Sequence, residues 1–263
     1  MPLSRPLAGI EALLVDLEGT VYETGRAVPG AAQALEELAR RGIACGFVTN
    51  TTSRPRSALV RELSGMGIAV EPERLYTAPL AGRDYLISRG LRRCHLLVHE
   101  PVLEDFAGIE AVDSSPEAVV VGDIGEDFTF QRLNRAFRFL LNGAAFVTLA
   151  RNRYYRGPDG LLLDQGPFVA ALEYATGRVA TLTGKPSPDF YAAALGHLGV
   201  AASKTAVVGD DLESDVGGGR AAGLRGILVR TGKFRAETLD ASEDKPDHVI
   251  DSIADLPGLI AES

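Results

Sequence analysis

Short apolar runs alternate with amphipathic segments at the start of this chain. Ala12 to Val15 is an apolar run that ends in Asp16, and residues 31–39 then place apolar side chains at the i, i+3, i+4 spacing of a helix. Ile43 to Val48 is a second apolar run, and Pro55 follows where the first turn of another helix would begin. Strands that alternate with helices in this way predict parallel βαβ units.

The alternation starts again between residues 80 and 180, and a third time after residue 181. In the middle segment we expect strands at 95–98, 118–121 and 145–149, and an amphipathic helix at 130–141. After it, Ser187 and Pro188 are typical of the N-cap and first turn of a helix that ends at Leu198. Further strands are expected at 205–208, 227–229 and 248–250.

This order predicts an α/β protein in which a Rossmann-like parallel sheet is built from both ends of the chain. Residues 1–79 and 181–263 would form the core domain, and residues 80–180 a smaller α/β domain inserted into it. A length of 263 residues is sufficient for a core with such an insertion.

Composition narrows the functional classes. The formal net charge of -8 and the pI near 5.1 argue against a protein that binds nucleic acid or an anionic membrane. The apolar run within residues 1–10 is too short for a signal peptide, and no later run reaches the length of a membrane span, so we expect a cytoplasmic protein. Cys45 and Cys94 each lie in an apolar run, which favours buried reduced thiols over a disulfide.

The candidate chemistry follows the predicted core strands. In an open parallel sheet, ligands bind beyond the carboxyl ends of the strands. Taken singly, each of these segments would be read as a turn, a helix cap or a surface loop. Together they would bring acids, hydroxyls and one lysine to the same edge of the sheet. The polar residues that come after the strands are Asp16, Glu18, Thr20, Thr49, Asn50, Lys185, Asp210, Asp211 and Asp215.

Clustered carboxylates repel one another, and a hard divalent cation with oxygen ligands, commonly Mg²⁺, relieves that repulsion. Such a cation also binds phosphate. Thr49, Asn50 and Lys185 would then supply hydrogen-bond donors and a positive charge for phosphoryl oxygens. The pattern therefore favours phosphoryl transfer from a small phosphorylated substrate.

Four segments in this order resemble the haloacid dehalogenase superfamily of hydrolases: VDLEGT at 15–20, VTN at 48–50, GKP at 184–186 and GDDLESD at 209–215. Residues 153–177 and 227–235 look closest to the NagD-like subgroup with an inserted C2-type cap, which includes phospholysine phosphohistidine inorganic pyrophosphate phosphatase. The resemblance covers essentially the whole chain. It implies a Mg²⁺-dependent phosphatase acting on a small metabolite, a phosphoamidate or pyrophosphate, and it leaves open a homodimer formed through the cap.

Carried over from the resemblance, Asp16 is expected to be the nucleophile, which becomes transiently phosphorylated. The metal is expected to bind Asp16, Asp210 and the backbone carbonyl of Glu18. Asp215 and Asp211 are expected to contact these ligands without binding the metal themselves. Thr49, Asn50 and Lys185 are the expected phosphate-binding residues, and Glu18 the acid and base.

Glu18 departs from the superfamily pattern, in which the phosphatases usually carry Asp two residues after the nucleophile. Glu keeps the carboxyl group and adds one methylene, about 1 Å of reach, and a misplacement of that size can cost on the order of 10²-fold in rate. One alternative is therefore a catalytically attenuated protein that serves binding or regulation. A phospho-accepting receiver domain is a weaker alternative, because a receiver places its acid pair on the first strand and its phosphorylated Asp on a later one.

Overall fold

The structure is a computed structural model, and it describes residues 7–157 and 160–260. The chain divides into two compact units. Residues 1–49, 59–76 and 185–263 form the first, and residues 50–58 and 77–184 the second. The chain passes between the units after Thr49 and before Lys185, beside residues that the sequence assigned to phosphate binding.

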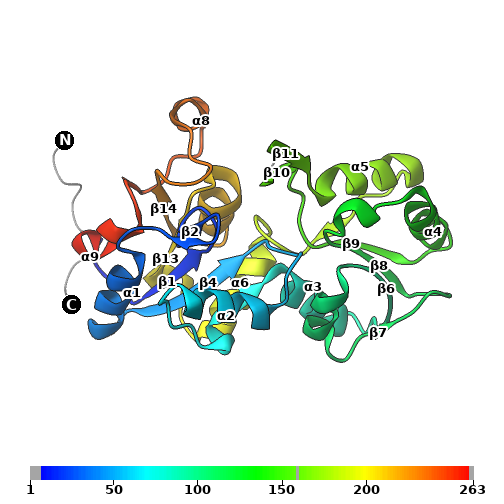
Figure 1. The fold of residues 1–263 in the computed structure, drawn as a ribbon, viewed down its shortest axis with the longest axis horizontal. Helices are drawn as coiled ribbons and strands as arrows, with labels where there is room; N and C mark the ends of the chain where they lie inside the picture. The colour runs from blue at the N-terminus through cyan, green and yellow to red at the C-terminus, as the bar shows by residue number, and fades with distance from the viewer. Residues whose placement is uncertain (1–6, 158–159, 261–263) are drawn as a thin grey trace. The chain divides into compact units, whose positions relative to one another are not determined.

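The first unit is built on a six-stranded sheet with the order β15-β14-β13-β1-β4-β5 (Figure 1). The pairs β15-β14, β14-β13, β13-β1 and β1-β4 are all parallel. The central strands β1 and β13 are buried along their whole length, because side chains cover both faces of a parallel sheet. The strands are β1 (Ala12–Asp16), β4 (Ala44–Thr49), β5 (Leu75–Thr77), β13 (Thr205–Gly209), β14 (Arg225–Val229) and β15 (His248–Ile250).

Helices of this unit bury one apolar stripe against the sheet. In α1 (Ala31–Arg40), four apolar residues at the i, i+3, i+4, i+7 spacing are buried, namely Ala31, Ala34, Leu35 and Leu38. The other main helices are α2 (Arg56–Gly65) and α6 (Pro188–Leu198), with the shorter α7 (Gly218–Ala221), α8 (Ala236–Ala241) and α9 (Leu256–Leu259). Ser187 is the N-cap of α6 as expected, but its side chain makes no capping hydrogen bond. A two-stranded ribbon, β2 (Tyr22–Glu23) with β3 (Arg26–Ala27), follows β1.

The second unit has its own parallel sheet, with the order β12-β9-β8-β6-β7. Its strands are β6 (Arg93–Leu97), β7 (Glu110–Ala111), β8 (Ala118–Val121), β9 (Ala145–Thr148) and β12 (Thr181–Leu182). Its helices are α3 (Ala78–Ser88), α4 (Phe130–Leu141) and α5 (Gln165–Thr176), and an antiparallel hairpin pairs β10 (Tyr154–Gly157) with β11 (Gly160–Leu163). The expected α/β fold, a parallel-sheet core with an inserted α/β domain, is confirmed, and the inserted domain also carries a parallel sheet.

Residues 50–58 were expected in the core domain but pack within the second unit. Thr52 bonds to Gln165, and the backbone N–H of Arg56 donates to Asp105 over 2.9 Å. Both partners belong to the second unit, so these polar contacts tie the segment to it. The sequence had placed the boundaries at 79/80 and 180/181.

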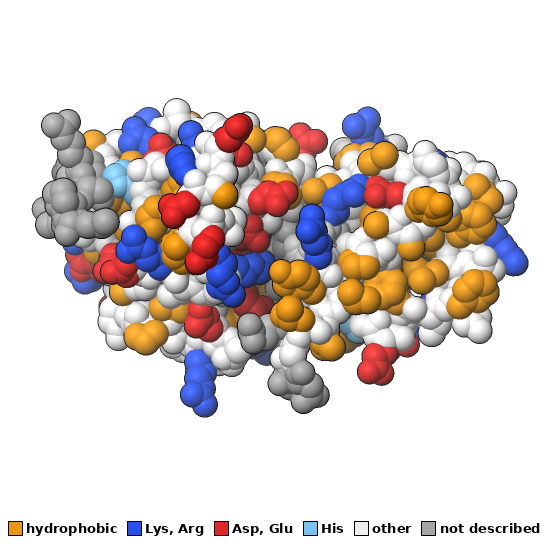
Figure 2. Space-filling model, turned by 90° about the horizontal axis from the view of Figure 1, so that it is seen from above, with side chains coloured by type: hydrophobic (Ala, Val, Ile, Leu, Met, Phe, Trp, Pro, Cys, Tyr) orange, Lys and Arg blue, Asp and Glu red, His pale blue; other side chains and the backbone are white. Residues whose placement is uncertain are grey.

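The exposed large apolar side chains of the described chain all belong to the second unit. Figure 2 shows several orange patches on the face that it presents. These exposed residues are Leu103, Phe130, Leu141, Tyr154, Tyr155, Leu161, Leu162, Leu163, Tyr174 and Val179. Within residues 7–157 and 160–260, no helix combines the length and apolar character needed to cross a bilayer.

Both cysteines are free thiols buried in strands, one in each unit. Burial raises the pKa of Cys45 and of Cys94 to about 11.

At pH 8 each thiol should therefore carry roughly 200-fold less reactive thiolate than an ordinary cysteine. We expect slow release of chromophore from a thiol-reactive disulfide reagent by the folded protein, with the rate rising as the pH is raised toward 11. Unfolding in guanidinium should release two equivalents at once, and rapid labelling of the folded chain would contradict the burial.

Candidate active site

Three buried carboxylates meet at the carboxyl end of the first unit's sheet. Asp16 ends β1 and Asp210 follows β13, and these neighbouring parallel strands are in register at Val15 and Val208. Asp215 lies in the short π-helix η5 (Leu212–Gly217) that follows. One oxygen from each carboxylate lies within 4.8 Å of the others. The structure therefore brings together the three acids that the sequence placed after the first and the late strand.

Lys185 joins two of these acids. Its Nζ lies 2.5 Å from an oxygen of Asp16 and 2.5 Å from an oxygen of Asp215, and all three side chains are buried. Burial opposes the charge on Lys185, but the carboxylates of Asp16 and Asp215 raise the pKa of its ammonium well above the ordinary value. The ammonium is thus held charged, and it fixes one oxygen of Asp16.

The cluster holds more acidic groups than basic ones. Burial, followed by the charges of Asp16 and Asp215, raises the pKa of Asp210 to about 8. Burial also raises the pKa of Asp215 to about 7, although the ammonium of Lys185 opposes that shift. Three carboxylates face a single buried ammonium, and all the ligand atoms are oxygens. Such a donor set fits a hard divalent cation.

Glycines allow the backbone to approach these carboxylates closely. A Cβ on Gly209 would come within 2.2 Å of Asp215 Oδ2. A Cβ on either Gly19 or Gly232 would come within 2.0 Å of Asp210 Oδ2, and both residues have positive φ, at +91° and +62°. Side chains at these three positions would displace the acids.

Residues 231–233, after β14, contact the same cluster and were not assigned a role from the sequence. The backbone N–H of Lys233 donates to Asp210 Oδ2 over 2.7 Å, and its Nζ lies 3.3 Å from Asp211 Oδ2. The hydroxyl of Thr231 donates to the carbonyl of Gly19. A Thr-Gly-Lys segment directly after a core strand was the available signal, because the rule that located the other site residues applies to this strand as well.

Glu18 and Asp211 occupy more open positions. The Glu18 side chain is exposed, and its backbone forms a bridge with Tyr22. The carboxylate of Asp211 is a quarter exposed and accepts hydrogen bonds from the backbone N–H groups of Glu213 and Ser214. Burial acts to raise the pKa of Asp211, but the Lys233 ammonium and the backbone N–H of Ser214 outweigh it, so the pKa is lowered.

Thr49 ends β4, the strand next to β1, and Asn50 follows it; Asp16 of β1 is in register with Val48 of β4. Thr49 is buried at the end of that strand. Asn50 belongs to the second unit, and its side chain lies against Gly184: a Cβ on Gly184 would come within 2.7 Å of Asn50 Oδ1 and 2.1 Å of the carbonyl of Leu149. The glycine of the GKP segment therefore gives room to Asn50.

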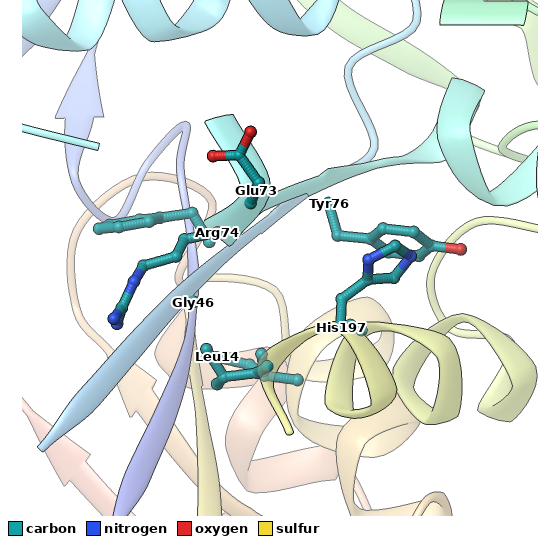
Figure 3. A pocket seen from close by; sticks show the side chains of 9 residues that line it. Leu14, Gly46, Glu73, Arg74, Tyr76 and His197 are labelled. Carbon is teal, nitrogen blue, oxygen red and sulfur yellow. The ribbon is translucent and has the colours of Figure 1, made fainter. Parts of the chain in front are cut away.

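A small pocket elsewhere in the first unit shares no residue with the carboxylate cluster (Figure 3). Its empty volume is about 200 Å³, part of it open to solvent. Figure 3 shows the rings of Tyr76 and His197 close together beside it, and their centroids are 4.9 Å apart. Most of its lining is apolar or aromatic, and it adds nothing to the chemistry of the carboxylates.

Two family models match this chain. One, described as haloacid dehalogenase-like hydrolase, matches residues 13–110, and the other, described as HAD-hydrolase-like, matches residues 182–256. Haloacid dehalogenase-like hydrolase domain-containing protein 2 of Bos taurus is 44% identical over 90% of this chain and 88% of its own length. The chain belongs to the haloacid dehalogenase-like hydrolases. The resemblance inferred from the four motifs is confirmed, and so is the prediction of a hydrolase of this superfamily.

Other similar proteins carry an activity in their names. Phospholysine phosphohistidine inorganic pyrophosphate phosphatase of Homo sapiens is 36% identical over 99% of this hydrolase and 98% of its own length. Among solved structures, 4-nitrophenylphosphatase of Thermotoga maritima aligns with a TM-score of 0.91 and 30% identity, covering 96% of this chain and 98% of its own. Glycerol phosphate phosphatase of Mycobacterium tuberculosis in complex with magnesium aligns with a TM-score of 0.87 and 28% identity, covering 96% and 79%.

The contact between Gly209 and Asp215 gives a test of the site's construction. Gly209→Ala should push the Asp215 carboxylate away from Lys185 and lower the free energy of unfolding by about 1–3 kcal/mol, as overpacking does. Gly196→Ala is the matched control, because Gly196 lies inside α6 with no atom within 4 Å of its added Cβ. The control should be stabilised by about 0.5–1 kcal/mol. Equal stability of the two variants in urea unfolding would contradict the close approach.

Proposed function

We propose that this hydrolase is a Mg²⁺-dependent phosphatase that acts through an aspartyl-phosphate on Asp16. One observation carries the proposal: the buried ammonium of Lys185 holds an oxygen of Asp16 inside a cluster of carboxylates. An aspartate without a chemical role would not require a buried ammonium beside its carboxylate. A nucleophile that must receive a phosphoryl group requires a fixed orientation and a nearby positive charge. The phosphatase names of similar proteins support the same activity.

Asp16 and Asp210 are the proposed ligands of the magnesium ion, together with the backbone carbonyl of Glu18. Asp215, which lies in the same cluster, orients Lys185 and is bonded to the backbone N–H of Asp211 over 3.2 Å. When bound, the ion would offset the carboxylate charge and bind phosphoryl oxygens. A similar solved structure is in complex with magnesium, which supports this choice of metal.

In the proposed first step, a carboxylate oxygen of Asp16 attacks phosphorus while the bond to the leaving group breaks. Thr49, Asn50 and Lys185 would bind the phosphoryl oxygens, and Glu18 would give its proton to the leaving group. In the second step, the Glu18 carboxylate would take a proton from water, whose oxygen attacks phosphorus and releases Asp16. The products are inorganic phosphate and the dephosphorylated leaving group.

The proposed substrate is a small phosphorylated metabolite, a phosphoamidate or pyrophosphate. A similar protein is named for phospholysine, phosphohistidine and inorganic pyrophosphate, and another for 4-nitrophenyl phosphate. We propose that the inserted domain, residues 80–180 in the sequence-based division, serves as the cap that selects among leaving groups. A homodimer through the cap stays a prediction, supported by the exposed apolar side chains of the second unit.

The defining experiment is hydrolysis of 4-nitrophenyl phosphate with and without Mg²⁺. We expect nitrophenolate release that is lost in excess chelator and restored by Mg²⁺, because the uncompensated carboxylates repel phosphate. Asp16→Asn should lower the rate by about a thousandfold or more, since the amide keeps the shape but is not a nucleophile.

Circular dichroism of Asp16→Asn serves as the control for folding. Full activity in chelator would refute the metal requirement. A phosphoenzyme trapped by mass spectrometry on any residue other than Asp16 would refute the assigned nucleophile.

Glu18 separates a fully active enzyme from the attenuated alternative. If Glu18 is the acid and base, Glu18→Gln should lower kcat by about 10²-fold or more with alkyl phosphates, and less with nitrophenyl phosphate, whose leaving group needs no proton. If the side chain is only too long, Glu18→Asp should raise kcat instead. Unchanged rates for both variants across a series of leaving groups would exclude Glu18 as the proton shuttle and leave it only its backbone.

A further inference from the structure

Thr52 makes a buried polar connection inside the second unit. Its hydroxyl donates to Oε1 of Gln165 over 3.0 Å and accepts from the backbone N–H of Asp123 over 3.0 Å. Gln165 is fully buried at the start of α5, and its Nε2 donates to the carbonyl of Ala150 over 2.7 Å. The hydroxyl of Thr52 is thus bonded as donor and as acceptor, and its side-chain partner Gln165 is shielded from water.

This connection lies next to a proposed phosphate-binding residue. Asn50 is two residues before Thr52 and packs against Gly184, which directly precedes Lys185. Asn50, Thr52, Gln165 and Gly184 all belong to the second unit. An anchor at Thr52 therefore restricts the backbone from which Asn50 extends.

We infer that Thr52 and Gln165 are positioning residues for phosphate binding. Their hydrogen bond fixes residues 50–52, so that the Asn50 amide stays beside Gly184 where a phosphoryl group would meet it. The buried setting makes this bond specific, because breaking it leaves a polar group unpaired away from water. The inference deepens the proposed function and rests on it. It also makes phosphate binding depend on the second unit's own polar interior.

The test compares variants by their inhibition by inorganic phosphate during hydrolysis of 4-nitrophenyl phosphate in Mg²⁺. Thr52→Val keeps the shape of the side chain and removes the hydroxyl, whereas Thr52→Ser keeps the hydroxyl. We expect Thr52→Val to raise the Ki of phosphate and the KM by about fivefold or more, with Thr52→Ser within about twofold of the parent.

Thr176→Val is the matched control. The Thr176 hydroxyl also donates to a carbonyl, that of Leu172, and accepts from a backbone N–H, that of Arg178. It lies at the opposite end of α5, about 16 Å from Gln165 at 1.5 Å per residue. Loss of a hydrogen-bonded hydroxyl from this unit should therefore lower the Tm of both valine variants, but only Thr52→Val should weaken inhibition by phosphate.

Gln165→Met removes the same bond from the other side. In the double variant with Thr52→Val, the Ki should rise by less than the product of the two single-variant factors, because both changes break the same hydrogen bond. If Thr52→Val does not fold, Gln165→Met decides the question by the same fivefold criterion.

Equal Ki values for Thr52→Val and Thr176→Val, in a parent chain that hydrolyses the ester, would overturn the positioning role alone. A parent chain that neither hydrolyses the ester nor responds to phosphate would overturn the proposed function and this inference with it.

Discussion

The buried ammonium of Lys185 between Asp16 and Asp215 is the interaction on which the site depends. Placing carboxylates together out of water is unfavourable, and each acid alone would tend to take up a proton. One lysine within 2.5 Å of two of them offsets part of that cost. Removing one partner of such a buried pair typically costs about 3–5 kcal/mol, because the other charge remains.

The fold supplies the positions that this interaction needs. Parallel pairing of β1 with β13 brings Asp16 and Asp210 to one end of the sheet. Glycines at 19, 209 and 232 then admit the carboxylates against the backbone, at distances that no Cβ could tolerate. The same packing that concentrates negative charge makes the cluster suited to a divalent cation. Structure and chemistry are therefore linked through close packing.

The second unit contributes more than a separate layer of structure. The chain first enters it immediately after Thr49 and leaves it for the last time immediately before Lys185. Gln165 in its interior bonds to Thr52, so a residue close to Asn50 is held by an element far away in sequence. Under the proposed function, this unit would select substrates and order part of the phosphate site, so hydrolysis would depend on its own packing.

The α/β class, the insertion and the order of the motifs can be read from the residues alone. Apolar runs ending in Asp16, Thr49 and Asp210 predict that these residues share an edge, because parallel strands bring their carboxyl ends together. The rule that parallel strands share their carboxyl ends does not predict contacts that depend on the path of a loop. Lys233 donates to Asp210, and residues 50–58 pack with the second unit. These two points emerge only in the folded chain, since hydrogen bonds between distant segments leave no periodic signal in the sequence.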